Sequence, residues 1–562
     1  MIQIVSTSTF DITSTVLKID LLTHSLTHSL TPLLFFFFFF FLSLPAPAAG
    51  PATQSNTYRS IEENMSSLPK EVANLVFSLH QAVCFSHRVD EITQLYEAQF
   101  REINDKYYNN TPWPTAALIA KECSNDELFM CLYTEITTKA LFNKYKSQTV
   151  YDQILAWHNY IKLFELFIAY SGDAKKTYLL SNNWINEIIT EFVYQFQGFC
   201  QYRSQLTKRS SDEIKVLIEN KSTWNLPKVV SILKSLGNLI NHSNEFYQKF
   251  GFFASVETVR LECLIGDYSA CLKSASAILK DDRSDYFAIS QLQHINFYYH
   301  TGVAYLMCRQ ISHAVNAFSD IILHINRVFK HVQRSQISSQ ISKTIEKLIV
   351  FAALVSLLCP GLRLEDQVKE LVDKGPAHAP GTFRSNDSGE NKMWAEKLRR
   401  ISDGDILAYT ELFENNCPKF IYPAIPDYAN VTNDYNMDAF DAQVNVFMTE
   451  VLQCLSVRKI RSYLKLYTSI DVSKLARFNE LSEDALVAQL LSYKHKNIEV
   501  VNDVATSISD VQYHFSGSNL LIESTNNKKD RLLDVDRHFN SGIRKNQELQ
   551  STLTKYFSHY NL

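Results

Sequence analysis

The chain has 562 residues and a formal net charge of −4. This length suffices for several domains or one elongated array, and the charge excludes a global field that would attract nucleic acid or an acidic membrane surface. Glycine and proline are scarce, at 14 each, whereas 28 tyrosines and 36 phenylalanines stand among apolar residues that recur at helical spacing. The composition therefore predicts a mainly α-helical protein with large buried interfaces.

Residues 1–64 are predicted to be a low-complexity extension, disordered or spurious, outside the folded protein. The apolar run Leu33–Leu42 contains seven consecutive phenylalanines, which is too short to span a bilayer but long enough for a signal-peptide core. However, no basic region precedes it, and the repeat Thr23–Leu30 resembles a translated tetranucleotide repeat. We therefore expect Met65 to be the working start, with a targeting segment as the alternative.

Residues 65–250 are predicted to form an N-terminal helical region. Two prolines around Trp113 cannot lie inside a helix, so a fixed turn with an indole to bury is expected there. Further along, Tyr151–Tyr170 and Trp184–Tyr202 each show an apolar stripe at helical spacing. The first stripe holds Ile154, Trp157, Ile161, Phe164 and Ile168, and the second holds Ile188, Phe192, Phe196 and Phe199. Core packing is favoured over a cofactor site for both.

Residues 251–455 are predicted to continue as tetratricopeptide-like helical hairpins of a solenoid. The segments around Gly266 and Gly302 place small residues where paired helices would cross and large ones between them. Stacking such hairpins buries a continuous core. The sequence then predicts a linker at Gly375–Asn391 and a helical stretch at Met393–Phe413. An extended crossing is predicted at Cys417–Pro426. A helix from Phe440 through Val451 then leads onward.

Residues 456–523 have the pattern of a winged helix. Val457–Tyr467 is predicted to be helical, Thr468–Ile470 to be a break, and Asp471 to cap a short helix that ends at Phe478. Ser482 is the expected N-cap of a third helix. The apolar period then becomes two, which predicts a hairpin that turns at Ser516–Asn519.

A winged helix raises the question of nucleic-acid binding, which the charges disfavour. The third helix would be the reading helix, yet it opens with Glu483 and Asp484, whereas readers concentrate basic side chains on the contact surface. The preceding helix does have a basic side that is a candidate for weak RNA contact, although a solvated face is the simpler interpretation. Its residues are Arg458, Lys459, Arg461 and Lys465.

Residues 524–562 are predicted to form a C-terminal bundling helix. Apolar residues keep a three-four spacing there, and such a seam requires a partner helix, either from the same solenoid or from another chain. Both possibilities stay open. The residues expected to form the bundle are Phe539, Leu549, Leu553 and Tyr556.

Motifs that would indicate an enzyme are missing from the sequence. It contains no phosphate-binding loop, no dinucleotide fingerprint and no H-E-x-x-H zinc motif. Ten cysteines are scattered without a C-x-x-C pair or a clustered Cys/His set, which predicts neither a metal site nor a disulfide framework. The expectation is a non-catalytic protein without cofactors.

Four long stretches, in the right order, carry a family resemblance. They are Asn110–Ala120, Glu191–Arg203, Cys417–Val431 and Ile460–Phe478. They resemble subunit L of eukaryotic translation initiation factor 3, one of the PCI-domain families whose outline is a helical solenoid followed by a winged helix. Nothing before Met65 resembles the family, Leu239–Phe252 is shortened, and the linker at 375–391 is divergent. The alternatives are a PCI subunit of the proteasome lid or the COP9 signalosome, or a nucleic-acid-binding winged helix.

The resemblance implies a cytoplasmic scaffold subunit that supports preinitiation complex assembly on the small ribosomal subunit and mRNA recruitment. It also implies assembly with sister PCI subunits, subunit K especially, through winged-helix sheets and helical bundling. For the sheet contact we expect Val511, Tyr513, Phe515, Leu520 and Ile522. About half of them at most should face a partner, since one side of a two-faced strand must cover the module's own core.

Overall fold

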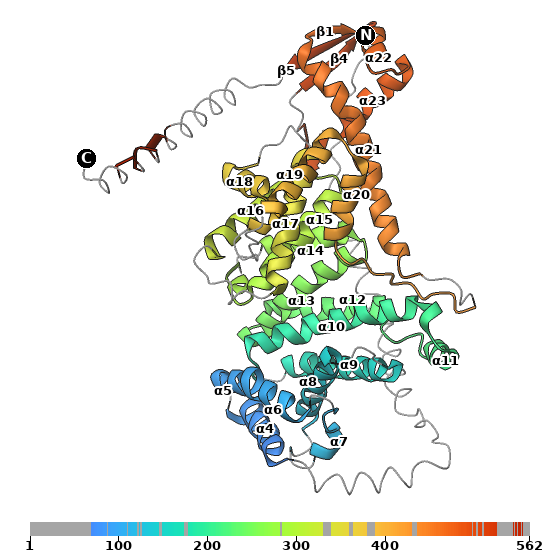
Figure 1. Cartoon of the computed structure of the whole chain (residues 1–562). Helices are drawn as coiled ribbons and strands as arrows, with labels where there is room; N and C mark the ends of the chain where they lie inside the picture. The colour runs from blue at the N-terminus through green and yellow to red at the C-terminus, as the bar shows by residue number, and fades with distance from the viewer. Residues whose placement is uncertain are drawn as a thin grey trace, which may run out of the picture. The chain divides into compact units, whose positions relative to one another are not determined.

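The computed structural model describes residues 69–554 apart from several gaps, and Figure 1 labels its elements. The gaps are residues 87, 109–110, 121–122, 124–125, 145–148, 173–177, 281–283, 330–338, 359–363, 379–387, 430–434, 497, 502–503, 508–510, 525–542, 544–545, 548 and 552. The predicted extension 1–64 and the start at Met65 therefore lie outside the described residues. Within the described part the fold is mainly α-helical with short strands between residues 469 and 524, as predicted. None of the helices described there is long and apolar enough to cross a membrane.

The first helices surround the predicted proline turn. The Trp113 indole stacks on Phe100, with ring centroids 4.8 Å apart, and its Nε1 donates to Oδ1 of Asn104 at 3.0 Å. Trp113 is half-buried, so the turn is confirmed with part of the indole left in solvent. The elements are α4 (Lys70–Gln81), η1 (Ala82–Ser86), α5 (Val89–Thr93), η2 (Gln94–Gln99), α6 (Phe100–Tyr107), α7 (Ala116–Ile119) and α8 (Glu127–Lys144), of which η1 and η2 are π-helices.

An aromatic cluster joins α9 (Val150–Ser171) to α10 (Asn182–Ser204). All four residues predicted for the α10 stripe are buried. On α9 the predicted face was partly wrong, because Ile168 is 37% exposed while Tyr160 and Phe167 are buried. Apolar residues occupy most sides of α9, so spacing alone could not identify the face that meets α10.

The next elements bring Trp224 onto the same cluster, where its ring lies 5.3 Å from that of Phe192 and its Nε1 donates to the carbonyl of Gln153 at 2.9 Å. They are η3 (Leu206–Lys208), α11 (Ser211–Glu219), α12 (Leu226–Gly237) and η4 (Asn238–Asn241). Ser210 opens α11 with a capping box that it forms with Glu213, so two amide groups at the helix start are satisfied locally.

The two predicted hairpins are α13 (Glu245–Leu264) with α14 (Tyr268–Lys280) and α15 (Gln291–Met307) with α16 (Ile311–Phe329), separated by η5 (Ser284–Ala288). Their turns close in the same way, since Asp267 N donates to Glu262 O at 3.0 Å and Gln310 N donates to Tyr305 O at 2.9 Å. Both turns need a left-handed residue. Gly266 (φ 82°) supplies it in the first turn and Arg309 (φ 62°) in the second. The two hairpins therefore share the same turn geometry, although only the first has a glycine at this position.

The solenoid continues through α17 (Ser339–Leu358), α18 (Asp366–Lys374), η7 (Pro376–His378), α19 (Ser388–Asp403) and α20 (Ile406–Asn416). The predicted linker at 375–391 was too long, because α19 already begins at Ser388. The predicted single stretch Met393–Phe413 is two helices. Gly404, at φ 87°, ends the first, and the Asp405 carboxylate caps the second by accepting from Leu407 N at 3.0 Å.

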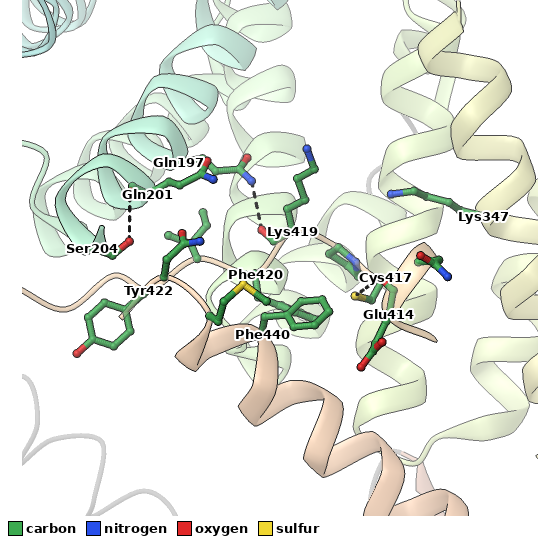
Figure 2. A pocket seen from close by; sticks show the side chains of 15 residues that line it. Gln197, Gln201, Ser204, Lys347, Glu414, Cys417, Lys419, Phe420, Tyr422 and Phe440 are labelled. Carbon is green, nitrogen blue, oxygen red and sulfur yellow. Dashed lines mark hydrogen bonds between the residues drawn. The ribbon is translucent and has the colours of Figure 1, made fainter. Parts of the chain in front are cut away.

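The extended crossing after Cys417 is confirmed, and it ties distant helices together. Ile421 N donates to Leu264 O of α13 at 2.9 Å, and Gln197 Nε2 of α10 donates to Lys419 O at 3.2 Å. Arg203 Nη2 donates to Pro423 O at 2.6 Å. Figure 2 shows this segment passing α10 beside a pocket of about 310 Å³.

A single helix, α21 (Asp438–Leu466), follows and belongs to two cores. Phe447 stacks on Phe413 of α20 at 4.0 Å within the large core, whereas Ile460 and Leu464 are buried in a second, smaller one. The helix predicted over Val457–Tyr467 does not begin there, because it is the second half of α21, and the hydroxyl of Ser456 donates to Gln453 O at 2.8 Å inside that continuous helix. The later elements are β1 (Ser469–Asp471), α22 (Val472–Phe478), α23 (Glu483–Lys496), β2 (Ile498–Val501), β3 (Val504–Ser507), β4 (Val511–Ser516) and β5 (Asn519–Ser524).

Two helical glycines make a matched pair for testing the packing. A Cβ on Gly251 of α13 would lie 2.2 Å from the backbone nitrogen of Ile240, whereas one on Gly198 of α10 would meet nothing within 4 Å. We expect Gly251→Ala to destabilise the chain by about 1–3 kcal/mol, because backbone cannot move aside. Gly198→Ala should instead stabilise it by about 0.5–1 kcal/mol. Urea unfolding compares the variants, and equal midpoints would contradict the close approach of η4 to α13.

A buried carboxyl predicts pH dependence. Glu135 is 1% exposed, its Oε2 accepts from Trp184 Nε1 at 3.3 Å, and burial raises its pKa from 4.5 to about 7 although Lys139 opposes the shift. The native state therefore binds more protons than the unfolded state between these values, so stability should fall as pH rises through this window. Glu135→Gln removes the titration and should raise stability at pH 8 by on the order of 2 kcal/mol, with a smaller gain near pH 4.5. A gain of equal size at both pH values, measured as the urea midpoint, would argue against this assignment.

Candidate docking site of the winged helix

The helices and the hairpin predicted for the winged helix are present, and the sheet has one more strand than expected. β1, β5 and β4 form an antiparallel sheet in that order, with Ile470 opposite Leu520 and Tyr513 opposite Ile522. The helix break predicted at Thr468–Ile470 is confirmed, because α21 ends at Leu466 and α22 begins at Val472, but the strand β1 that lies within it was not predicted. Three residues contain a single alternation of side chains, too little for a period of two to be recognised.

The helices of the module begin and end largely as predicted. Ser482 caps α23, with its Oγ accepting from Ala485 N at 3.3 Å. Asp471 is the N-cap of α22, although its carboxylate accepts from the Ser473 hydroxyl at 2.6 Å and not from a backbone amide. The hairpin turns at Gly517, whose φ of 62° suits glycine.

The core of the module fixes which side of the hairpin faces inward. The Tyr513 hydroxyl donates to Leu490 O at 2.5 Å, and its ring stacks parallel to Tyr493 of α23 with centroids 6.2 Å apart. Burial raises the pKa of Tyr513 well above its ordinary value, so the hydroxyl stays protonated and can donate. This bond anchors β4 to α23.

Four of the five hairpin side chains expected at a partner interface are used by this core. Phe515 is the exception, at 40% exposed. The buried ones are Val511 at 4%, Tyr513 at 6%, Leu520 at 0% and Ile522 at 8%. A contact through β4 must therefore use Phe515 and the backbone of the strand, not the alternating apolar side chains.

The hydrogen-bond pattern shows which backbone groups face outward. Ile522 N donates to Thr468 O, so the even-numbered residues of β5 face β1 and the odd-numbered ones face β4. The residues opposite Leu521 and Glu523 are His514 and Gln512. By alternation, the backbone groups of Tyr513 and Phe515 point away from β5, to a side where no other strand is described. β4 is thus an edge strand.

The acidic opening of α23 is exposed, as Glu483 and Asp484 both lie at the surface. The predicted basic side of α21 is divided. Arg458 and Arg461 are half-buried, whereas Lys459 and Lys465 are exposed. Burial raises the pKa of Tyr409 on α20 to about 12, and the positive charge of Arg458 opposes that rise.

A second hairpin was not predicted. β2 and β3 pair antiparallel, with Val501 opposite Val504. The signal was available, because β-branched residues flank Asn502-Asp503, a dipeptide of turn-forming residues. It was missed because the alternating pattern was recognised only in the hairpin that turns at Ser516–Asn519.

The terminal segment is described only at scattered positions between Ile543 and Thr554, all of them helical. Leu549 and Leu553, two of the residues predicted for the bundle, are 61% and 53% exposed. Phe539 and Tyr556 lie outside the described residues. Four positions apart on a helix, Leu549 and Leu553 share one face.

The pocket beside the extended crossing is lined by ionisable side chains, Cys417 and Lys347 among them (Figure 2). Burial raises the pKa of the Cys417 thiol to about 12, which keeps it protonated at neutral pH. Burial lowers the pKa of Lys347, and its ammonium lies 5.7 Å from the centroid of the Tyr299 ring. The lining residues include members of α10, α17, the crossing itself and the start of α21, so the crossing packs between these helices.

Comparisons with known proteins identify the family of this chain. Residues 152–532 match the family model described as RNA polymerase I-associated factor PAF67. Eukaryotic translation initiation factor 3 subunit L of Nematostella vectensis is 34% identical over 457 residues, covering 77% of this chain and 82% of that protein. The proteins of the same name from Homo sapiens and Gallus gallus are each 31% identical over 493 residues, covering 82% of this chain and 83% of theirs. The chain belongs to the family of eukaryotic translation initiation factor 3 subunit L.

Proposed function

We propose that this chain is a non-catalytic scaffold subunit of eukaryotic translation initiation factor 3 that clasps sister subunits through its winged helix and its terminal helix. By doing so in the cytoplasm it supports preinitiation complex assembly on the small ribosomal subunit and mRNA recruitment. The observation that carries the proposal is the edge strand β4, whose outward backbone and exposed Phe515 are available to a partner strand.

The edge suits recognition by strand addition. A partner strand would receive and donate hydrogen bonds at the backbone of Tyr513 and Phe515, and the Phe515 side chain would supply apolar contact beside them. The anchoring bond from Tyr513 to Leu490 keeps β4 in place, so little ordering cost remains when a partner binds. Sister PCI subunits, subunit K among them, are the partners we propose for this edge and for the terminal helix.

The edge is tested by a charge at Phe515. Phe515→Asp places a carboxylate beside the open backbone and removes the exposed ring, so strand addition should weaken by about tenfold, or ~1.4 kcal/mol. The tagged full-length chain is expressed in cells, and co-purified initiation-factor subunits and small ribosomal subunits are quantified by mass spectrometry. We expect fewer sister subunits with the variant than with the wild-type chain.

Leu407→Asp is the matched control, because Leu407 is 72% exposed on α20, outside the winged helix. It should retain the partners of the wild type. Equal loss in both variants would indicate a general effect of surface charge, and co-purification of proteasome-lid or signalosome subunits would overturn the proposed complex.

The terminal helix is tested in the same assay. Leu549→Asp combined with Leu553→Asp should reduce recovery of subunit K while leaving the melting temperature of the isolated chain unchanged, because both side chains are more than half exposed. Gln547→Asp combined with Ser551→Asp adds the same charge on the opposite face and should retain subunit K. A lowered melting temperature with intact recovery would instead mean that the helix packs on its own chain.

Nucleic-acid recognition is the second candidate function, and the exposed Lys459 and Lys465 are what favour it. A reader of this kind would lose salt-dependent RNA binding when both lysines are changed to glutamate. The scaffold proposal expects that change to leave sister-subunit recovery intact.

A further inference from the structure

Three side chains with metal-binding groups meet near the start of the described chain, away from the winged helix. His80 stands in the last turn of α4, Cys84 in the π-helix η1, and Asp126 directly before α8. Their ligand atoms all lie within 4.8 Å of one another, and Cys84 Sγ is 3.6 Å from Asp126 Oδ2. No sequence motif predicted this group, because the two segments are about forty residues apart and lack the close spacing of known zinc motifs.

The burial of the His80 imidazole without hydrogen-bond partners in the described part of the chain points to a ligand. It is 2% exposed, and neither ring nitrogen has a hydrogen-bond partner among the described residues. A buried polar group left without a partner destabilises the folded chain, because it has given up its hydrogen bonds to water. The ring is held by edge contacts with Phe129 at 4.8 Å and Phe85 at 5.6 Å, so its direction toward the thiol and the carboxylate is set by packing.

The backbone around the cluster orients the other two groups. Residues four apart lie on one side of a helix, which places Cys84 beside His80. η1 is a π-helix, a feature often found at functional sites. Asp126 Oδ1 accepts from Phe129 N at 3.0 Å, and this bond leaves Oδ2 turned toward Cys84. Second contacts of this kind are what hold metal ligands in position.

We propose that His80, Cys84 and Asp126 form a Zn²⁺ site. Imidazole, thiolate and carboxylate are the ligands zinc takes in proteins, and tetrahedral bonds of about 2.3 Å to sulfur and 2.0 Å to oxygen put these two atoms roughly 3.5 Å apart. On binding, the Cys84 thiol gives its proton to solvent and one nitrogen of the neutral imidazole donates its lone pair to the ion. The bond to zinc would give one of the two ring nitrogens of His80 a partner.

Cys123 is a candidate for the fourth ligand, but its Sγ is not among the ligand atoms that lie within 4.8 Å of one another, so its side chain would have to turn toward the ion. It is fully buried, and its carbonyl accepts from Asp126 N at 3.0 Å, so it lies in the same turn. A closed set of four ligands is the arrangement of structural zinc sites. Such a site would join α4 and η1 to the start of α8 and stabilise the first helices of the solenoid.

The test titrates the purified full-length chain, first stripped with a chelator, with Zn²⁺ in competition with a chromophoric chelator. We expect one tightly bound equivalent. Cys84→Ser and Asp126→Asn, which preserve side-chain size, should each weaken binding by at least about tenfold. With Co²⁺ as the probe, a thiolate-to-cobalt charge-transfer band should appear in the wild type and vanish in Cys84→Ser.

Cys454 provides a matched control, because its Sγ also lies 3.6 Å from a carboxylate oxygen, that of Glu450, but no histidine completes a group there among the described residues. Cys454→Ser should bind Zn²⁺ like the wild type. Absence of a bound equivalent in the wild-type chain, or unchanged affinity in Cys84→Ser, would overturn the proposal. Circular dichroism confirms that each variant is folded, and a Cys123→Ser variant that keeps wild-type affinity would assign the fourth position to water.

Discussion

The continuity of α21 is the constraint on which the rest of the fold depends. Its first half is buried in the solenoid core through Phe447, which stacks on Phe413, and its second half is buried in the winged-helix core through Ile460. A stacked aromatic pair contributes about 0.5–1.5 kcal/mol beyond its buried area. Because one hydrogen-bonded helix serves both cores, neither can lose its part of α21 without exposing apolar surface.

Glu450 extends this coupling to other elements. Its carboxylate lies 2.6 Å from the ammonium of Lys496 at the end of α23 and 3.7 Å from Nε of Arg309 in the turn between α15 and α16. Glu450 and Lys496 are both largely shielded from water, which favours their ion pair over the weak pairs typical of a surface. The left-handed Arg309 thus has a partner in α21, which gives a reason for arginine at a position where the preceding repeat has glycine.

Sequence patterns predicted the elements that have long, regular faces. The α10 stripe, the capped α23 and the hairpin at Gly517 were all found, because each repeats one period several times or has a distinctive cap or turn residue. β1 and the division of α19 from α20 were missed, since three residues or one glycine carry little periodic signal. The inward use of Tyr513 and Ile522 could not be predicted either, because alternation shows that a strand has two faces but not which face the module's own helices cover.

The candidate metal ligands could not be predicted from the sequence for a different reason. Spacing rules detect ligands that share one turn or one hairpin, whereas His80 and Asp126 meet only after α4 and α8 have packed together. The fold also determines which basic side chains remain available at the surface. Lys496 forms an ion pair with Glu450, and Arg458 is half-buried, so these two basic residues at the junction of the two cores are partly withdrawn from the surface. A reading surface for nucleic acid would need those charges at the surface, together with a basic opening of α23, and that opening is acidic. The same internal pairing leaves the backbone of β4 as the recognisable feature of the module, which favours a protein partner.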